Sequence, residues 1–299
     1  MSLVTDAKVI QNKQVIPGYC RMDLAAPSVA ERARPGQFLH VRCGSTHDPL
    51  LRRPISINAV ARRTGEVSLL YRIAGRGTAL LAGHRAGDMV SIVGPLGRGF
   101  TIPEGNENVI VVCGGIGIAP LYFFLQELAG LGIKATVLQG AATAKQLLLE
   151  NEMKELGHSV LMATDDGTRD FYGSVTKLFE NYLQNSDFAP GPGAGDHLTM
   201  NKGQAGQVSK GLVNKYNRQE GDPVRCVYAC GPHGMLSKLS EITGRRGIPC
   251  EVSLEERMGC GVGACLSCAC KVKTGNGGAG YRRVCVEGPV FQSGEVNWE

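Results

Sequence analysis

The sequence predicts an α+β protein in three parts: an antiparallel β-barrel, an α/β domain with a parallel sheet, and a small cysteine-rich module. Roughly the first hundred of the 299 residues hold short β-rich runs broken by turn residues. The next part alternates apolar strands with helices, which is the pattern of a doubly wound parallel sheet. Near the end, four cysteines stand at close spacings. We place the three parts at residues 1–102, 103–250 and 251–299.

The strands expected in the first part are rich in β-branched, aromatic and apolar residues. They are 19–24, 38–43, 55–60, 67–73 and 89–93. Turns are expected between them at pairs such as Pro35-Gly36, Thr64-Gly65 and Gly94-Pro95. The only helical signal expected there is a short one near Thr78 to Leu81. This pattern is typical of an antiparallel barrel or sandwich.

In the second part, expected strands alternate with expected helices. The strands are 109–112, 135–139, 159–163 and 224–229, and the helices are one ending near Ala129, then 146–156, 175–183 and 235–243. The continuous apolar run 109–112 indicates a sheet that is covered on both faces. Residues 185–221 are rich in glycine and proline and lack apolar periodicity. We expect them to form an insertion that is poorly ordered at its centre.

Composition narrows the function classes. The net charge is +5, without a dense run of Lys and Arg, so nucleic-acid binding is not expected. The uncharged stretch from Val109 to Leu125 approaches the length of a membrane span. Four interruptions, Gly114, Gly115, Gly117 and Pro120, favour a buried strand, a turn and a helix instead. The start of the chain lacks the pattern of a signal peptide, and eleven cysteines fit a reducing cytoplasm.

The cysteines carry the strongest functional signal. Cys260, Cys265 and Cys268 follow the pattern C-x4-C-x2-C, and Cys285 completes the set. This is the plant-type spacing for a [2Fe–2S] cluster, and the intervening glycines let backbone amides approach such an anionic group. Structural zinc fits less well, because zinc ribbons usually pair two short C-x2-C units. Cys270 lies two residues beyond Cys268 and is interpreted as a buried small residue, not as a ligand.

Several other motifs point to nucleotides. Arg53 precedes Pro54, Ile55 and Ser56, and an arginine placed so can hold a phosphate. Glycines before Thr78, including Gly77, stand at the start of a short helix, and such a helix N-terminus can bind an anion. Arg53 and this helix start are then two phosphate-holding elements, which suggest a dinucleotide such as FAD. In the second part, glycine turns follow two strands, where parallel sheets bind nucleotides. These turns contain Gly114, Gly115 and Gly117, then Cys230, Gly231 and Pro232.

Together, these residues resemble the ferredoxin–NADP reductase superfamily and, with the cysteines, the electron transfer subunits of class 1B dihydroorotate dehydrogenases. The matching segments run in family order: Pro35-Gly36-Gln37-Phe38, Arg53-Pro54-Ile55-Ser56, Gly77-Thr78, Gly94-Pro95-Leu96-Gly97, Gly99-Phe100, Gly114-Gly115-Ile116-Gly117, Ala119-Pro120-Leu121, Thr164-Asp165-Asp166-Gly167, Cys230-Gly231-Pro232, Val284-Cys285 and Glu287-Gly288-Pro289-Val290-Phe291. They cover nearly the whole chain.

The resemblance implies a flavin barrel, a pyridine-nucleotide domain and a cluster module. It implies that FAD contacts Arg53, Pro54, Ile55, Ser56, Leu70, Tyr71, Arg72, Gly77 and Thr78. It further implies electron transfer between NAD and a catalytic dihydroorotate dehydrogenase subunit that carries FMN, within a heterotetramer of two of each chain. The strand after Ala135 ends in Gln139-Gly140-Ala141-Ala142 and lacks a basic residue for a 2′-phosphate, which favours NADH over NADPH.

Two alternatives stay open on the sequence. One is a flavin and iron–sulfur subunit of a related hydrogenase or NADP–ferredoxin transhydrogenase, which would share the same parts. The other is a non-catalytic redox sensor or metal scaffold that uses the cysteines structurally. The apolar tail around Val284, Val290 and Phe291 either docks a partner or caps the core of the cluster module.

Overall fold

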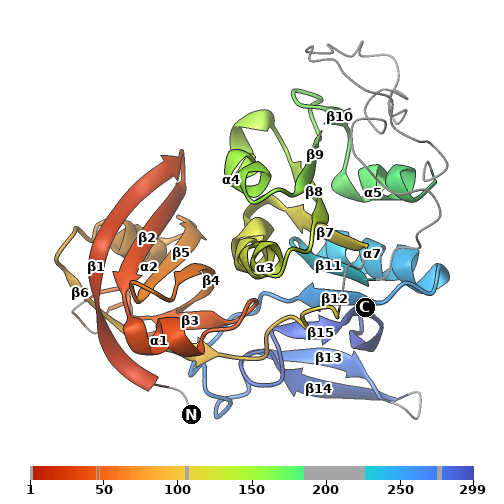
Figure 1. The fold of residues 1–299 in the computed structure, drawn as a ribbon. Helices are drawn as coiled ribbons and strands as arrows, with labels where there is room; N and C mark the ends of the chain where they lie inside the picture. Colours follow the sequence, from red (N-terminus) through yellow and green to blue (C-terminus); the bar gives the residue numbers. More distant parts are fainter. Residues whose placement is uncertain (1–2, 45, 47, 105–107, 185–225, 275–277) are drawn as a thin grey trace. The chain divides into compact units, whose positions relative to one another are not determined.

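A computed structural model describes residues 3–44, 46, 48–104, 108–184, 226–274 and 278–299 (Figure 1). The expected insertion at 185–221 lies outside the described residues. The chain divides into two compact units. The first, called the barrel unit here, comprises residues 1–102, 119–127 and 251–299. The second, the parallel-sheet unit, comprises residues 103–118 and 128–250.

Six antiparallel strands close into a barrel in the order β1-β2-β5-β4-β3-β6. Their bounds are Leu3–Ile16 for β1, Tyr19–Ala25 for β2, Phe38–Val41 for β3, Arg53–Ala61 for β4, Glu66–Arg72 for β5 and Met89–Leu96 for β6. Two short helices accompany them, α1 (Pro27–Arg32) and α2 (Arg76–Ala82). Alternate residues fill the interior, with Val9, Met22, Leu39, Ile57 and Leu69 almost fully buried. The expected barrel is therefore confirmed.

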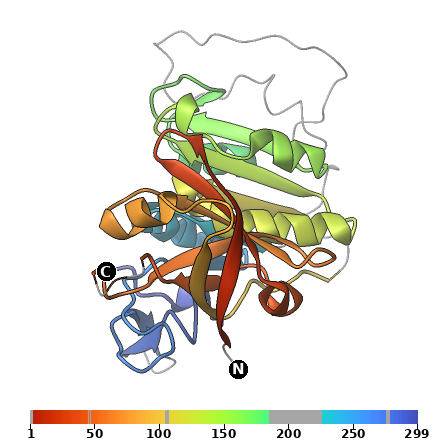
Figure 2. The ribbon, with the colours of Figure 1, turned by 90° about the vertical axis from the view of Figure 1, so that its left-hand side faces the viewer.

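The longest strand, β1, is absent from the expected strands. Three exposed apolar residues, Val4, Ile10 and Val15, break the alternation of polar and apolar residues, whereas Ala7 and Val9 point into the core. The strand pairs with β2 along one edge and with β6 along the other, and so closes the barrel. Figure 2 shows its strong curvature along the red part of the chain. Closure removes the exposed edges that an open sheet would present.

The parallel-sheet unit contains five parallel strands in the order β10-β9-β8-β7-β11. Their bounds are Phe171–Tyr172 for β10, Ser159–Thr164 for β9, Ala135–Ala141 for β8, Val109–Gly114 for β7 and Cys226–Cys230 for β11. The helices are α4 (Glu150–Glu155), α5 (Val175–Gln184) and α7 (His233–Arg245), with short 3₁₀ turns at Gly115–Gly117 and Ala144–Gln146. The helix expected at 146–156 is shorter, because a 3₁₀ turn and an extended segment replace its first part.

Helix α3 (Ile118–Gly130) follows β7, and residues 119–127 of it cluster with the barrel unit. Asn58 of β4 explains part of this, because its Nδ2 donates a 3.0 Å hydrogen bond to the carbonyl of Ala119. The guanidinium of Arg62 lies 5.7 Å from the centre of the Phe123 ring. Within the described residues, no helix combines the length and the apolar character that crossing a membrane requires.

The cysteine-rich module is built on two antiparallel pairs. Strand β13 (Ala269–Lys273) pairs with β14 (Ala279–Arg283), and β12 (Cys250–Ser253) pairs with β15 (Val290–Gln292), which leads into a 3₁₀ turn at Ser293–Glu295. The tail residues Val284, Val290 and Phe291 are buried at 0%, 8% and 3% exposure. Of the two interpretations offered for this tail, these three side chains fit packing inside the module.

This module docks on the end of barrel strand β6. The backbone N–H of Arg98 donates to the carbonyl of Gly288 at 2.5 Å. Gly97 has a φ of +79°, and a Cβ there would lie 2.5 Å from the Gly288 carbonyl oxygen. The positive φ and the close approach to Gly288 explain why a glycine stands at position 97.

Candidate functional site

The four cysteines of the predicted cluster site lie on one loop and at the end of one strand. Cys260 and Cys265 belong to the irregular segment before β13, Cys268 immediately precedes β13, and Cys285 follows β14. Cys268 and Cys285 are both 2% exposed, whereas Cys260 is half-buried and Cys265 is exposed. One side of the site is therefore enclosed by protein and the other opens to the surface.

Backbone amides of the loop point at the sulfur atoms. The Sγ of Cys260 accepts from the N–H of Val262 at 3.4 Å and of Ala264 at 3.2 Å. The Sγ of Cys265 accepts from the N–H of Cys260 at 3.4 Å and contacts the Ser267 hydroxyl at 3.2 Å. Hydrogen bonds from Ser267 and Cys260 lower the pKa of Cys265 to about 6. This loop stabilises negative charge on sulfur, as a thiolate-bound cluster needs.

The buried pair behaves differently. Burial, followed by the hydrogen bond and charge of Cys268, raises the pKa of Cys285 to about 12. Burial therefore disfavours the thiolate form of Cys285, and a bound cation would offset that cost. Among the described residues, no group of three or more Cys, His, Asp or Glu converges on a single-ion position. A [2Fe–2S] cluster divides four thiolates between two irons, and the four cysteines supply that number of thiolates.

Cys270 stands apart from this set. It lies on β13 opposite Arg282 of β14 and is 8% exposed. Burial raises the pKa of its thiol. It is a small buried residue of the strand, as expected, and its exclusion from the ligands stays a prediction.

Two residues that the sequence did not single out hold the cysteine loop. Arg283 donates from Nη1 to the carbonyl of Gly263 at 3.0 Å, and its Nη2 contacts the Glu287 carboxylate at 2.6 Å. On the barrel side, His40 lies against Gly261. In the sequence, the four-residue spacing between Arg283 and Glu287 could have indicated the role of Arg283. His40 could have been noticed as the lone polar residue in the apolar run Phe38–Val41, but such a histidine is more often an ordinary core residue.

In the barrel, Arg53 and Gly77 meet. A Cβ on Gly77 would lie 2.8 Å from the Nε of Arg53 and 3.1 Å from the Sγ of Cys43. The Nη1 of Arg53 donates to the carbonyl of Leu51 at 2.7 Å, which fixes the guanidinium. The arginine that starts β4 therefore reaches the start of α2, and the two predicted phosphate-holding elements are neighbours.

Other predicted flavin residues are divided between surface and core. Pro54 and Ser56 are half-buried and Arg72 is exposed, whereas Leu70 and Tyr71 are 2% and 3% exposed. The Tyr71 hydroxyl donates to Asn12 Oδ1 at 3.1 Å, and burial raises its pKa. The hydroxyl of Thr78 accepts from the N–H groups of Ala74 and Gly75 and so caps α2.

The two glycine turns of the parallel-sheet unit lie side by side. Strands β7 and β11 are parallel neighbours, with Cys113 opposite Cys230. A Cβ on Gly117 would lie 2.1 Å from the Cys230 carbonyl oxygen, and one on Gly114 would lie 2.8 Å from the side chains of Pro232 and Met235. Parallel sheets bind nucleotides at this carboxyl edge, and only glycine allows the two turns to approach so closely there.

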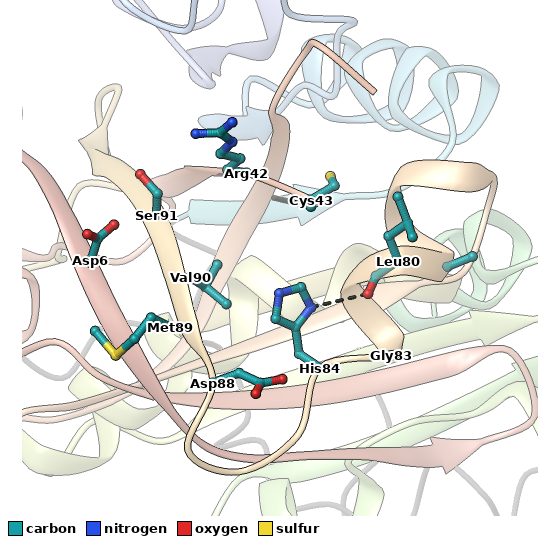
Figure 3. Close-up of a pocket in the computed structure, with 12 residues that line it drawn as sticks. Asp6, Arg42, Cys43, Leu80, Gly83, His84, Asp88, Met89, Val90 and Ser91 are labelled. Carbon is teal, nitrogen blue, oxygen red and sulfur yellow. Dashed lines mark hydrogen bonds between the residues drawn. The ribbon is translucent and has the colours of Figure 1, made fainter. Parts of the chain in front are cut away.

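A separate pocket of about 800 Å³ opens on the barrel (Figure 3). Asp6, Arg42, His84 and Ser91 are among its lining residues, and the His84 ring contacts the Leu80 carbonyl at 3.1 Å. Its lining includes none of the residues expected to hold flavin or nicotinamide. It adjoins the Arg53–Gly77 contact through a further lining residue, Cys43.

Comparison with known proteins decides the family. The model of the iron–sulfur cluster binding domain of dihydroorotate dehydrogenase B matches residues 255–297. The dihydroorotate dehydrogenase B (NAD(+)) electron transfer subunit of Desulforamulus reducens is 42% identical over 299 residues, which is all of both chains. This chain belongs to that family. The family member of Geobacillus thermodenitrificans is 35% identical, with 96% of each chain covered.

Solved structures support the fold of this electron transfer subunit family member. A structure of NADH-dependent reduced ferredoxin–NADP oxidoreductase, described for flavin-based electron bifurcation, matches with a TM-score of 0.75 and 25% identity over 98% of this chain and 90% of that chain. A ferredoxin NADP+ reductase from Neisseria gonorrhoeae with bound FAD and NADP matches with a TM-score of 0.58 at 15% identity, over 85% and 94%. The resemblance to the ferredoxin–NADP reductase superfamily and the expected fold class are confirmed.

Proposed function

We propose that this chain carries electrons between a catalytic dihydroorotate dehydrogenase subunit and NAD, using a [2Fe–2S] cluster and FAD, in pyrimidine biosynthesis. The observation that carries the proposal is that the cysteine loop and the flavin-type barrel form one compact unit, in contact at Gly261 and His40. The full-length likeness to electron transfer subunits supports it.

The cofactor set follows from the chemistry of the carriers. Nicotinamide exchanges two electrons as a hydride, a [2Fe–2S] cluster exchanges one, and a bound flavin does both. Each part of the chain then has a role. Cys260, Cys265, Cys268 and Cys285 hold the cluster, and the loop amides stabilise its sulfur atoms. Arg53 and the backbone at Gly77 hold the FAD diphosphate. The paired glycine turns after β7 and β11 receive the dinucleotide.

The burial of Leu70 and Tyr71 refines the flavin site. Both residues are almost fully buried on strand β5, so we assign them to the inner wall of the site. Thr78 serves the same site indirectly by capping α2. Pro54, Ile55, Ser56 and Arg72 complete the proposed set.

The partner is the catalytic subunit, in an assembly of two of each chain. Exposed apolar residues lie in or against the loop that carries the exposed Cys265: Val262 and Leu266 are 52% and 63% exposed, and Val286, which lies against Gly263, is 40% exposed. Apolar side chains beside a redox centre suit a docking surface, through which electrons leave the chain. We assign the complex to the cytoplasm, where a reducing environment preserves thiolate ligands.

The test uses the isolated subunit and the reconstituted complex. The isolated chain should reduce artificial dyes with NADH and show no dihydroorotate oxidation. Adding the catalytic subunit should give NAD+-linked dihydroorotate oxidation. The Cys285→Ser variant should keep NADH–dye activity and lose NAD+-linked turnover. Dihydroorotate oxidation by the chain alone, or no association at micromolar concentration, would contradict the proposal.

A second candidate follows from the match to an NADH-dependent ferredoxin–NADP oxidoreductase. Under it, the same subunit would exchange electrons with a ferredoxin or a hydrogenase. Ferredoxin-dependent turnover that exceeds dihydroorotate-dependent turnover in the native complex would place it first. The native partner, identified by co-purification and mass spectrometry, separates the two candidates directly.

A further inference from the structure

His40 is a buried histidine of the barrel whose ring has unused hydrogen-bonding capacity. It lies on β3 and is 1% exposed. Neither Nδ1 nor Nε2 has a hydrogen bond of good geometry among the described residues. Buried polar groups are nearly always paired, so an unpaired imidazole in a barrel needs a reason other than fold stability.

The position of His40 supplies that reason. On one side its backbone pairs with Pro54 of β4, in the segment that we assign to flavin. On the other side its ring faces the cysteine loop: a Cβ on Gly261 would lie 2.6 Å from Nδ1 and 3.0 Å from Cγ. Gly261 has a φ of +72°, and it directly follows Cys260. The ring thus lies between the flavin strand and the first cysteine of the cluster loop.

Polar groups of both segments flank the ring. Burial and the charge of Arg52 lower the pKa of His40, whereas the backbone carbonyls of Arg52 and Cys260 act to raise it. The Arg53 charge also acts on the ring. A neutral imidazole has one N–H and can serve one carbonyl. Because Nδ1 is the nitrogen that faces Gly261, the carbonyl of Cys260 is the natural acceptor.

We propose that His40 is a positioning residue for electron transfer: its ring forms the surface on which Gly261 rests, and in the cluster-loaded protein its Nδ1–H, which has no partner among the described residues, donates to the carbonyl of Cys260. The contact holds the cysteine loop at a fixed separation from the flavin strand. Electron transfer weakens steeply with the distance between two carriers, so a rigid contact at this point sets the separation that matters. This inference rests on the proposed function, because it assumes that the cysteines hold a cluster.

The first experiment compares full-length variants purified with flavin. His40→Leu removes the N–H, and His40→Asn keeps an N–H near the position of Nδ1. His158→Leu is the matched control, since His158 is also buried, at 5% exposure, and lies in the parallel-sheet unit. The readouts are the iron-to-flavin ratio, the rate of iron release to a ferrous chelator after dithionite reduction, and the EPR spectrum of the reduced protein.

The expected pattern is specific to positioning. Iron release should be about tenfold faster in His40→Leu, the effect of one hydrogen bond lost from a buried carbonyl, and its EPR line shape should broaden. His40→Asn should restore the parent rate within about twofold, and His158→Leu should leave both readouts unchanged. The inference would be overturned if His40→Leu released iron at the parent rate, or if His40→Asn released iron as fast as His40→Leu.

A second pair of variants keeps the inference testable if His40→Leu does not fold. Gly261→Ala places a methyl group against the ring, whereas Gly18→Ala has a similar φ of +80° and nothing within 4 Å of the new Cβ. Faster iron release in Gly261→Ala alone supports the contact, and equal release in both variants contradicts it. A parent protein that binds flavin but no iron refutes the proposed function instead, so the two failures are distinguishable.

Discussion

Arg283 donates a 3.0 Å hydrogen bond from Nη1 to the carbonyl of Gly263, inside the cysteine loop. The same guanidinium is held by the Glu287 carboxylate through Nε and Nη2. The hydrogen bond and charge of Glu287 raise the pKa of Arg283, and the charges of Cys285 and Cys268 add to this effect, so the guanidinium also acts on both sulfur positions. One side chain therefore fixes the loop and offsets the negative charge that thiolate ligands bring.

Replacing Arg283 with leucine should loosen the loop. We expect iron release to a chelator to be about three- to tenfold faster, which is below the roughly ten- to hundredfold range for a charge-assisted hydrogen bond, because the side chain is partly exposed. The rate of iron release from Arg283→Lys should lie between the rates of the parent and of Arg283→Leu, since lysine keeps the charge but loses the planar guanidinium fork. Arg282→Leu is the control, because Arg282 pairs instead with Glu295. Equal effects at both arginines would contradict the role of the Gly263 contact.

Two cysteine variants separate a proposed ligand from its buried neighbour. Cys285→Ser should lose cluster absorption and most of its iron while it keeps flavin, because a serine hydroxyl replaces a soft thiolate ligand. Cys270→Ser should keep the visible spectrum, since that thiol lies in strand β13. Ultraviolet–visible spectra and iron analysis of both proteins provide the measurement. Iron loss in Cys270→Ser would overturn the proposed ligand set.

Arg53→Ala should weaken flavin binding. Losing a charge-assisted hydrogen bond to a phosphate amounts to about 1.5–3 kcal/mol, or roughly ten- to hundredfold in affinity. The fraction of flavin that the protein retains after gel filtration measures this loss of affinity. Arg63→Ala is the matched control, because Arg63 is exposed on the turn after β4. Unchanged retention in Arg53→Ala would remove Arg53 from the site, and FMN in place of FAD would revise the cofactor.

Gly117→Ala should impair nicotinamide binding. The new Cβ would meet the Cys230 carbonyl oxygen, and the two glycine turns would have to separate. We expect the Kd for NADH to rise by about tenfold or more, since the turns form the proposed binding edge. Gly130→Ala, at the end of α3, meets nothing within 4 Å and should bind NADH as the parent does. Titration of intrinsic flavin fluorescence follows binding in both. In the parent, NADH should bind more tightly than NADPH.

Asp23 should make barrel stability depend on pH. Burial opposes its ionised form, but hydrogen bonds from Ser68, Gln11 and Arg21 outweigh this and lower the pKa of Asp23. The Arg21 Nε lies 3.0 Å from its Oδ1. Because the folded-state pKa is depressed, the stabilisation is full above the unfolded carboxyl pKa and is lost as the pH falls through the folded value.

Urea unfolding followed by circular dichroism tests this dependence. Asp23→Asn should be about 1–3 kcal/mol less stable than the parent at pH 7. The difference should shrink below about pH 4, the ordinary range of an aspartate. Glu104→Gln, at an exposed carboxylate, should show no such convergence. A difference for Asp23→Asn that is constant from pH 7 to pH 3 would show that ionisation of Asp23 is not the cause.

Much of the local structure of this protein can be predicted from the sequence alone. The spacing of Cys260, Cys265 and Cys268 constrains one loop, and the glycines at Gly114 and Gly117 define one turn between a strand and a helix. Such features follow from the stereochemistry of adjacent residues and need no knowledge of the rest of the chain. Alternating strands and helices likewise predicted the parallel sheet.

Tertiary structure decided the contacts between distant segments. Strand β1 closes the barrel although exposed apolar residues obscure its pattern, because its neighbours β2 and β6 supply its hydrogen-bond partners. The approach of Arg53 to Gly77, and of His40 to Gly261, joins residues far apart in sequence. Periodicity reports which face of an element is buried, but not which other element covers it. That choice depends on how well whole surfaces pack, and here it places the cysteine loop against the flavin barrel.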